Sequence, residues 1–255
     1  MNLRKLILTS NDCYKAGKPL SPKGVMVHST GANNPSLKRY VGPDDGLLGY
    51  NKNNNHWNAP GIAKCVHAFI GKLADGSIAA YQTLPWDMRG WHCGKGPKGS
   101  GNDTHLSFEI CEDGLVDSVY FGKVFQEAVE LTAYLCALHG LNPLADGVVI
   151  GHYEGHARGI ASNHADPGNW FPKHGTNMDA FRKAVAVEMA KGKPVAPPEP
   201  DPDVDPGPPM EHWAAPYRQR LIGMGIEISD ERYDDPVTRG EMFTLMARAL
   251  EAVGK

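Results

Sequence analysis

The sequence predicts an α/β domain followed by a small helical C-terminal domain. Two observations predict the α/β domain: short apolar runs typical of strands recur between residues 23 and 150, and amphipathic helical patterns are interspersed with them. A third observation separates the two domains, because residues 194–209 are rich in proline and acidic side chains and predict an extended linker. The predicted boundaries are 1–192 for the α/β domain, 193–209 for the linker and 210–255 for the helical domain.

Three strands are predicted in the first half of the α/β domain. Lys23–Ser29 is a short apolar run after a proline-containing turn, which is typical of a core strand. Lys64–Ile70 and Ser77–Thr83 are two further apolar runs on either side of Asp75-Gly76. Because Asp-Gly between such runs is a strong hairpin signal, we expect these two segments to pair as a β-hairpin.

The second half adds two strands and two helices. His105–Cys111 alternates and predicts a strand with Glu109 inside it. The clearest helix covers about Tyr120–His139, where apolar residues recur at helical spacing. The apolar run Gly147–Ile150 predicts a buried strand, and a last helix is expected over about Asn177–Ala190.

The stretch from residue 151 to residue 172 carries the side chains best suited to chemistry. His152 directly follows the predicted strand 147–150, on what we expect to be a glycine-rich loop. Strand ends and loops on a rigid scaffold commonly carry metal ligands and catalytic groups, and imidazole with carboxylate is a ligand set that suits zinc. We expect Glu154 and His156 to organise the loop. The candidate side chains within fifteen residues are His152, Glu154, His156, His164 and Asp166.

Two motifs carry a resemblance to a known family. The pattern Gly-His, then His-x-Asp-Pro-Gly, in this stretch and the upstream Val27-His28-Ser29-Thr30 resemble the zinc N-acetylmuramoyl-L-alanine amidases of type 2, a family that includes the peptidoglycan recognition proteins. Residues 162–175 are most similar to amidases of Gram-positive phages and prophages. The resemblance covers about residues 1–190. It implies a central mixed β-sheet flanked by helices, and cleavage of the amide bond between N-acetylmuramic acid and L-alanine in bacterial peptidoglycan.

The resemblance implies one Zn²⁺ held by His28, His152 and Asp166, with a fourth position open for catalysis. A histidine on a strand is by itself more often a core residue, and Asp166 before Pro167-Gly168 could be a mere turn former. The motif around His28, matched with the downstream stretch, favours the ligand interpretation.

Glu109 and His164 are the predicted catalytic residues. The resemblance implies that Glu109 acts as the general base. Burying a carboxylate in an otherwise apolar strand costs free energy, which favours a functional role. The alternative is an edge-strand glutamate that faces solvent. His164 stands where many relatives carry a lysine thought to stabilise the tetrahedral intermediate, and histidine can donate the same hydrogen bond. His164 as a zinc ligand remains the alternative.

Four further residues are candidates for contact with substrate. His67 lies in a hairpin strand near the predicted metal, where substrate contact and a packed core histidine are equally favoured. Trp91 and His92 lie in a glycine-rich loop and are expected to line the substrate groove. Trp170 is assigned to the same groove, although a loop tryptophan is as often a lid over the core.

Residues 210–255 predict a small helical unit. Thr238 to Glu241 form a capping box that opens a helix with apolar residues on one face. The segment is similar to one repeat of the surface-layer homology modules, which bind cell-wall polymers and usually occur in threes. With fewer than fifty residues the unit has little core of its own, so we expect either wall binding or homo-oligomer formation.

Composition and charge limit the kinds of partner and the cellular location to be expected. The formal net charge is −3, which gives no reason to expect nucleic-acid binding, and no apolar run approaches membrane-spanning length. Met1–Ser10 lacks the apolar core of a signal peptide, and the odd number of cysteines, five, predicts free thiols. We therefore expect synthesis in a host cytoplasm, and the resemblance implies action on the bacterial wall in the role of a phage or prophage endolysin.

Two other functions compete with an amidase. A stem-peptide metallopeptidase is disfavoured because its motif is only faintly echoed at residues 154–163, without the first serine and the last aspartate. The H-E-x-x-H motif of zinc proteases is absent, because the spacing from His152 to His156 is wrong. A non-catalytic peptidoglycan-binding protein would be expected to lack a metal ligand, whereas all three candidates are present.

Overall fold

The computed structural model describes residues 1–114 and 117–191, so the predicted linker and helical C-terminal domain lie outside the described residues. The strands are β1 Leu3–Lys5, β2 Gly24–Ser29, β3 Ala68–Lys72, β4 Ile78–Gln82, β5 His105–Ile110 and β6 Val149–Gly151. The α-helices are α1 Asp12–Ala16, α2 Ser118–Leu138, α3 His152–Ala157 and α4 Met178–Lys191, and the 3-10 helices are η1 Leu37–Arg39, η2 Gly101–Asp103 and η3 Phe171–His174.

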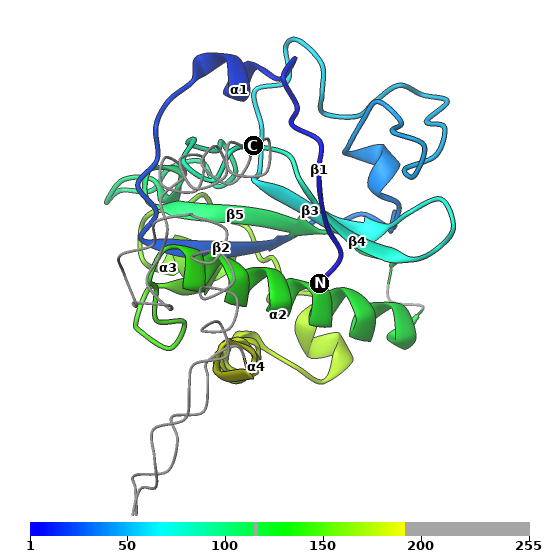
Figure 1. Ribbon diagram of the computed structural model, residues 1–255. Helices are drawn as coiled ribbons and strands as arrows, with labels where there is room; N and C mark the ends of the chain where they lie inside the picture. Colours follow the sequence, from blue (N-terminus) through cyan, green and yellow to red (C-terminus); the bar gives the residue numbers. More distant parts are fainter. Residues whose placement is uncertain (115–116, 192–255) are drawn as a thin grey trace, which may run out of the picture. The chain divides into compact units, whose positions relative to one another are not determined.

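The strands form one mixed sheet in the order β1-β4-β3-β5-β2-β6 (Figure 1). β3 and β4 pair antiparallel through the turn at Asp75-Gly76, and Gly76 adopts a positive φ of 83° there. The other neighbours pair in parallel. The predicted hairpin and the predicted mixed sheet flanked by helices are therefore confirmed.

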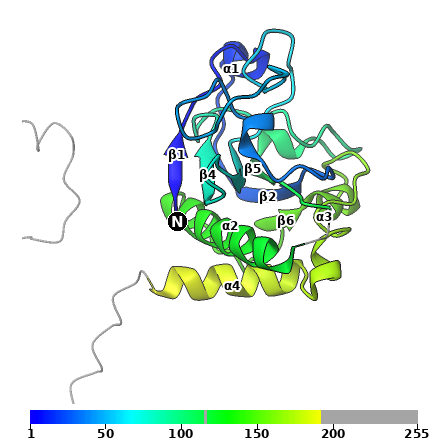
Figure 2. The ribbon, with the colours of Figure 1, turned by 90° about the vertical axis from the view of Figure 1, so that its right-hand side faces the viewer.

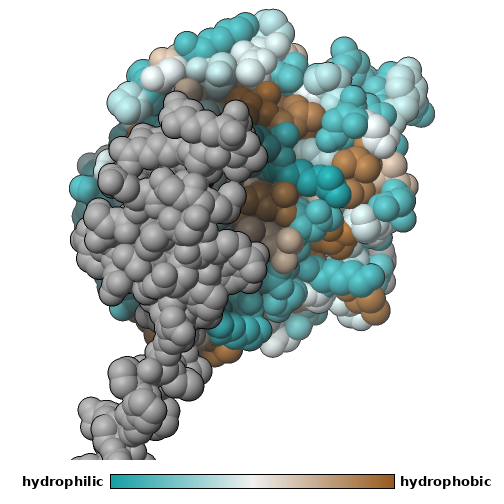
Figure 3. All heavy atoms as spheres, viewed as in Figure 1, coloured by the Kyte–Doolittle hydropathy of each residue, from teal (hydrophilic) through white to brown (hydrophobic). Residues whose placement is uncertain are grey.

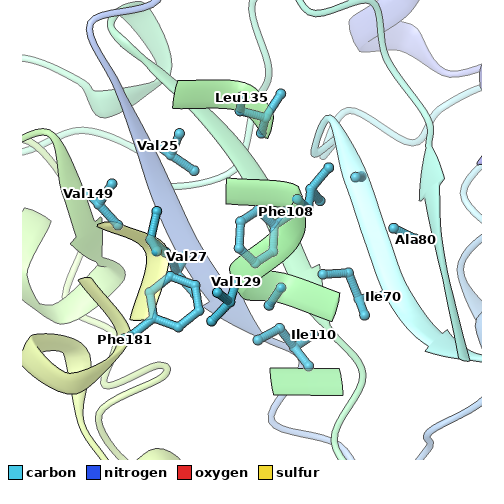
Figure 4. Close-up of a cluster of buried hydrophobic side chains, with 14 of the residues drawn as sticks. Val25, Val27, Ile70, Ala80, Phe108, Ile110, Val129, Leu135, Val149 and Phe181 are labelled. Atoms are coloured by element: carbon cyan, nitrogen blue, oxygen red, sulfur yellow. The ribbon is translucent and has the colours of Figure 1, made fainter. Parts of the chain in front are cut away.

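Helices α2 and α4 cover one face of the sheet. Figures 1 and 2 both show α2 running along the sheet, with α4 packed beside α2. Alternate residues of the central strands point into this layer, as expected for strands with period two. The resulting core includes Val25, Val27, Ile70, Ala80, Phe108, Ile110, Val129, Leu135, Val149 and Phe181 (Figure 4).

The opposite face of the sheet carries the remaining alternate residues. His28 pairs in register with Glu109, and Glu109 pairs with Phe69, so the three side chains form a row across β2, β5 and β3 on this face. Phe69 packs there in a second apolar cluster with Tyr40 and Trp57 from the long segment between β2 and β3. This face, away from α2 and α4, is where the candidate site forms.

The predictions differ from the structure at three places. β1 and α1 were not predicted, and β1 is only three residues long. Residues 152–157 form helix α3 rather than the expected loop. The predicted strand over 64–70 begins only at Ala68, because Cys65 forms an isolated bridge with Trp91 instead of joining the sheet.

The prediction of free thiols is confirmed, because all five cysteines are buried and unpaired with one another in disulfides. In the part of the chain that the structure describes, no helix has the length and apolar character needed to cross a membrane. On the face seen in Figure 3, hydrophobic residues lie in separate patches between hydrophilic ones.

Candidate metal centre

His28, His152 and Asp166 converge on one point at the edge of the sheet. His28 Nδ1 lies 3.0 Å from Asp166 Oδ2 and 3.1 Å from His152 Nδ1. His152 Nδ1 lies 3.4 Å from Asp166 Oδ1. Both histidines are buried, with exposed fractions of 1% and 4%. These three are the residues predicted from the sequence as metal ligands.

The spacing of these atoms fits a tetrahedral zinc ion. Ligand atoms about 2.0–2.2 Å from a tetrahedral Zn²⁺ stand roughly 3.3–3.6 Å apart. Here the two Nδ1 atoms lie 3.1 Å apart, and those of His28 and His152 lie 3.0 Å from Oδ2 and 3.4 Å from Oδ1 of Asp166, so small shifts would admit one ion. Two neutral imidazoles can share only one proton between their facing nitrogens. A cation at the centre would instead satisfy both nitrogen lone pairs and the carboxylate together.

The protonation states suit a metal as well. Burial lowers the pKa of His28, although Asp166 opposes the shift. Burial by itself would raise the pKa of Asp166, but hydrogen bonds from His152 and His28 outweigh it and hold that pKa below its usual value. A neutral imidazole and an ionised carboxylate are the forms that bind zinc.

Close packing at the end of β6 brings His152 to Asp166. A Cβ at Gly151 would stand 2.9 Å from Pro167 Cδ, so only glycine allows this approach. The backbone N–H of Tyr153 donates to the carbonyl of Asp166 at 3.3 Å. The start of α3 and the Asp166-Pro167 segment are thereby held side by side.

An ion pair fixes α3 against α4. Glu154 accepts a hydrogen bond from the Gly151 N–H at 2.8 Å and forms an ion pair with Arg182 at 2.9 Å. Arg182 also donates to the carbonyl of Val149 at 2.9 Å. Glu154 therefore supports the strand end that carries His152, as predicted, although it does so on a helix. Arg182 was not predicted from the sequence.

The outer nitrogens of both histidines also have partners. His28 Nε2 lies 2.9 Å from His92 Nδ1, and His152 Nε2 lies 3.3 Å from Ser162 Oγ. If both histidines bind metal through Nδ1, each Nε2–H donates to the partner named, which fixes the ring orientation. Ser162 was not identified from the sequence, since an isolated serine in a polar segment gives no distinguishing signal.

A pocket of about 310 Å³ adjoins the metal group and contains Glu109, Trp91 and His92 in its lining. Glu109 Oε2 and His92 Nε2 are buried without a hydrogen-bond partner among the described residues. Burial raises the pKa of Glu109 well above its usual range and lowers the pKa of His92 well below its own. Glu109 is therefore not the solvent-facing edge residue of the alternative interpretation.

His164 lies beside the group rather than in it. Its ring centroid is 4.7 Å from that of His152, and its Nδ1 lies 3.0 Å from Ser162 Oγ. The side chain is exposed, and it is outside the set of converging ligand atoms.

Two of the predicted substrate contacts, His67 and Trp170, are buried in this structure. His67 is 0% exposed and bonds to Ser107 and to the carbonyl of Met88, and burial lowers its pKa to about 4. Trp170 is 1% exposed and packs edge-on against Phe121 in the core. Both side chains are enclosed by the protein itself, so neither presents a surface to a ligand.

Sequence comparison with known proteins covers the residues of the candidate site. Residues 18–169 match the family described as N-acetylmuramoyl-L-alanine amidase, a range that contains the three converging residues and Glu109. The chain belongs to this amidase family. Similarity to CwlH of Bacillus subtilis (strain 168), an N-acetylmuramoyl-L-alanine amidase, extends over 135 residues at 29% identity. That alignment covers 42% of this chain and about half of CwlH, 52%.

Solved structures share the fold of the amidase domain. The hydrolase AmiA of Staphylococcus aureus, solved with its ligand, has a TM-score of 0.50 at 18% identity, over 74% of this chain and 82% of AmiA. A mutant structure of PlyL has a TM-score of 0.50 at 21% identity, over 72% of this chain and 98% of PlyL. At these identities the likeness concerns the arrangement of sheet and helices.

Proposed function

We propose that the chain is a zinc-dependent N-acetylmuramoyl-L-alanine amidase that hydrolyses the bond between N-acetylmuramic acid and L-alanine of peptidoglycan. The observation that carries the proposal is the convergence of His28, His152 and Asp166, whose ligand atoms lie within 4.8 Å of one another, beside the unpaired Oε2 of Glu109. Membership of the amidase family supports the reaction and the substrate class.

Zinc held by His28, His152 and Asp166 would act as a Lewis acid on the scissile carbonyl and promote ionisation of water. Glu109 then serves as the general base, because its buried carboxylate is a stronger proton acceptor than an exposed one. His164, at the exposed rim, donates a hydrogen bond to the oxygen on which negative charge develops.

The bond cut can be identified by mass spectrometry of purified cell walls digested with zinc-loaded protein. We expect peptides with a free L-alanine amino group and glycans with a free lactyl carboxyl group, with metal-depleted protein as the control. Cleavage between two residues of the stem peptide would instead indicate a metallopeptidase. Binding without any cleavage by the zinc-loaded protein would indicate a non-catalytic binding protein.

The role of His164 can be tested by substitution. His164→Ala is expected to keep zinc and lose about 10²–10³-fold in kcat, the usual cost of one oxyanion donor. His164→Lys should recover part of that loss, since lysine can donate the same bond. Zinc content and steady-state kinetics provide the measurement. Loss of zinc in His164→Ala would make the residue a ligand, and loss of neither zinc nor rate would make it structural.

We also propose that the chain acts as a phage-type lysin and that residues 210–255 bind wall polymer or associate with a second copy. The motif at residues 162–175 and the repeat-like sequence at the C-terminal end support these roles. A protein truncated to residues 1–192 is expected to cleave soluble muropeptides but to bind intact walls more weakly than the full chain in a co-sedimentation assay. Equal binding by both forms would favour association over wall binding, and sedimentation velocity would report the change in mass.

A further inference from the structure

The pocket beside the metal group has a composition that the proposed reaction does not by itself explain. It measures about 310 Å³, within the range of pockets that hold small ligands. It adjoins the ligand group through His92, whose Nδ1 lies 2.9 Å from His28 Nε2. The lining residues that carry the inference are Arg39, Tyr40, Trp57, Lys64, His92 and Glu109.

Two buried polar atoms of the pocket, Glu109 Oε2 and His92 Nε2, have no protein partner among the described residues. Buried polar atoms without partners are rare and indicate that a ligand or solvent completes them. With His28 donating from Nε2, His92 accepts at Nδ1 and keeps its own proton on Nε2. The pocket then offers one donor and one acceptor, which is the complement of a peptide group.

The mouth of the pocket carries two cations, Arg39 and Lys64. Neither forms an ion pair with any residue in the described ranges, and Arg39 donates only to the carbonyl of Asn55 at 2.5 Å. The guanidinium carbon of Arg39 lies 5.2 Å from the ring centre of Tyr40, and Lys64 Nζ lies 4.8 Å from that of Trp57. Packing on these rings holds both charges at the pocket.

Two aromatic residues of the pocket, Tyr40 and Trp57, are not arranged to stack on a sugar. Tyr40 and Trp57 are 6% and 9% exposed. Tyr40 stacks on Phe69 at an interplanar angle of 11°, and Trp57 meets Phe69 edge-on at 89°. With their faces used by Phe69 and by the two cations, the rings support charged groups rather than a pyranose face. The unpaired cations therefore favour an anionic ligand group.

We propose that this pocket binds the stem peptide and that Arg39 and Lys64 recognise the free α-carboxylate of its second residue, D-glutamate. This inference rests on the proposed amidase function and adds a specificity to it. In peptidoglycan this glutamate is joined through its γ-carboxyl, so its α-carboxylate is the anionic group of the stem nearest the scissile bond. Where that carboxylate is amidated, the charge that the two cations match is absent.

The test compares two synthetic N-acetylmuramoyl pentapeptides that differ only in the second residue, α-carboxylate or α-carboxamide. For the zinc-loaded full-length protein, kcat/KM is expected to be about tenfold higher for the carboxylate form, since two partly exposed charge contacts are each worth a few-fold. The ratio should fall as salt is added, because exposed charges are screened. In Arg39→Gln/Lys64→Gln the ratio should approach one, whatever the change in the two separate rates.

Lys38→Gln is the matched control, because Lys38 lies in the same short helix as Arg39 but does not line the pocket. It is expected to keep the wild-type ratio.

Two outcomes would overturn the inference: a wild-type ratio near one, or a ratio that does not change in the double variant. If both substrates are still cleaved, the proposed function is unaffected by either outcome. Calorimetric titration of zinc-loaded Glu109→Gln with the same two muropeptides measures the preference without turnover. If the calorimetry shows a preference for the carboxylate form but the wild type cuts no muramoyl–alanine bond, the proposed function is contradicted. The assignment of the pocket is then still supported.

Discussion

Replacing His152 with alanine is expected to remove zinc from the protein and to bring amidase activity below detection. His152 Nδ1 stands 3.1 Å from His28 Nδ1 and 3.4 Å from Asp166 Oδ1, so its loss leaves only two of three converging ligands. Catalytic zinc sites use three protein ligands, and two are not enough to hold the ion tightly. Metal analysis after dialysis should fall from about one zinc per chain in the wild type to almost none.

A control on the same helix separates loss of metal from damage to α3. His156→Ala changes an exposed histidine of α3 outside the ligand group, and it should keep both zinc and activity. Circular dichroism should show that both variants remain folded, because Glu154 and Arg182 still fix the helix. Full zinc occupancy in His152→Ala would refute the ligand assignment.

Replacing Glu109 is expected to have the next largest effect, a loss of about 10²–10⁴-fold in kcat with zinc retained. Glu109→Gln keeps the shape of the side chain but cannot accept a proton from water, and Glu109→Ala removes the group altogether. The carboxyl oxygen Oε2 has no hydrogen-bond partner in the described part of the chain, so neither change breaks a hydrogen bond at that atom. Thermal unfolding should therefore show little loss of stability.

Zinc content, melting temperature and kcat are measured for the wild type and the Glu109 variants to test this prediction. Glu188→Gln on α4 is a suitable control, because Glu188 lies outside the metal group and the pocket beside it and forms an ion pair with Lys191 near the end of the helix. Near wild-type turnover in a folded, zinc-loaded Glu109→Gln protein would remove Glu109 from the catalytic role. Loss of zinc in that variant would instead mean that the carboxyl supports the metal group.

Much of the fold follows from local pattern. The alternation in His105–Ile110 and the helical spacing in Ser118–Leu138 indicate which residues face the core, because strands repeat every two residues and helices every 3.6. Asp75-Gly76 predicts the hairpin because glycine there tolerates the positive φ that the turn requires. Of the elements that the sequence did not predict, β1 and α3 are short and draw their stability from neighbours distant in the sequence. β1 joins the sheet only through β4, and α3 depends on the ion pair from Glu154 to Arg182.

The sequence by itself, through its motifs and their resemblance to the amidase family, indicated His28, Glu109, His152 and Asp166 as candidate site residues, and it placed His28 and His152 at the ends of strands. Only the tertiary structure decided which polar and aromatic residues face the site. His67 and Trp170 are enclosed by partners 40 and 49 residues away in the chain, Ser107 and Phe121, while His92 reaches the edge of the metal group and Arg39 and Lys64 meet at one pocket. The physical reason is that residue type and periodicity are local properties, whereas burial and hydrogen-bond partners arise from contacts between segments that the chain brings together only when it folds.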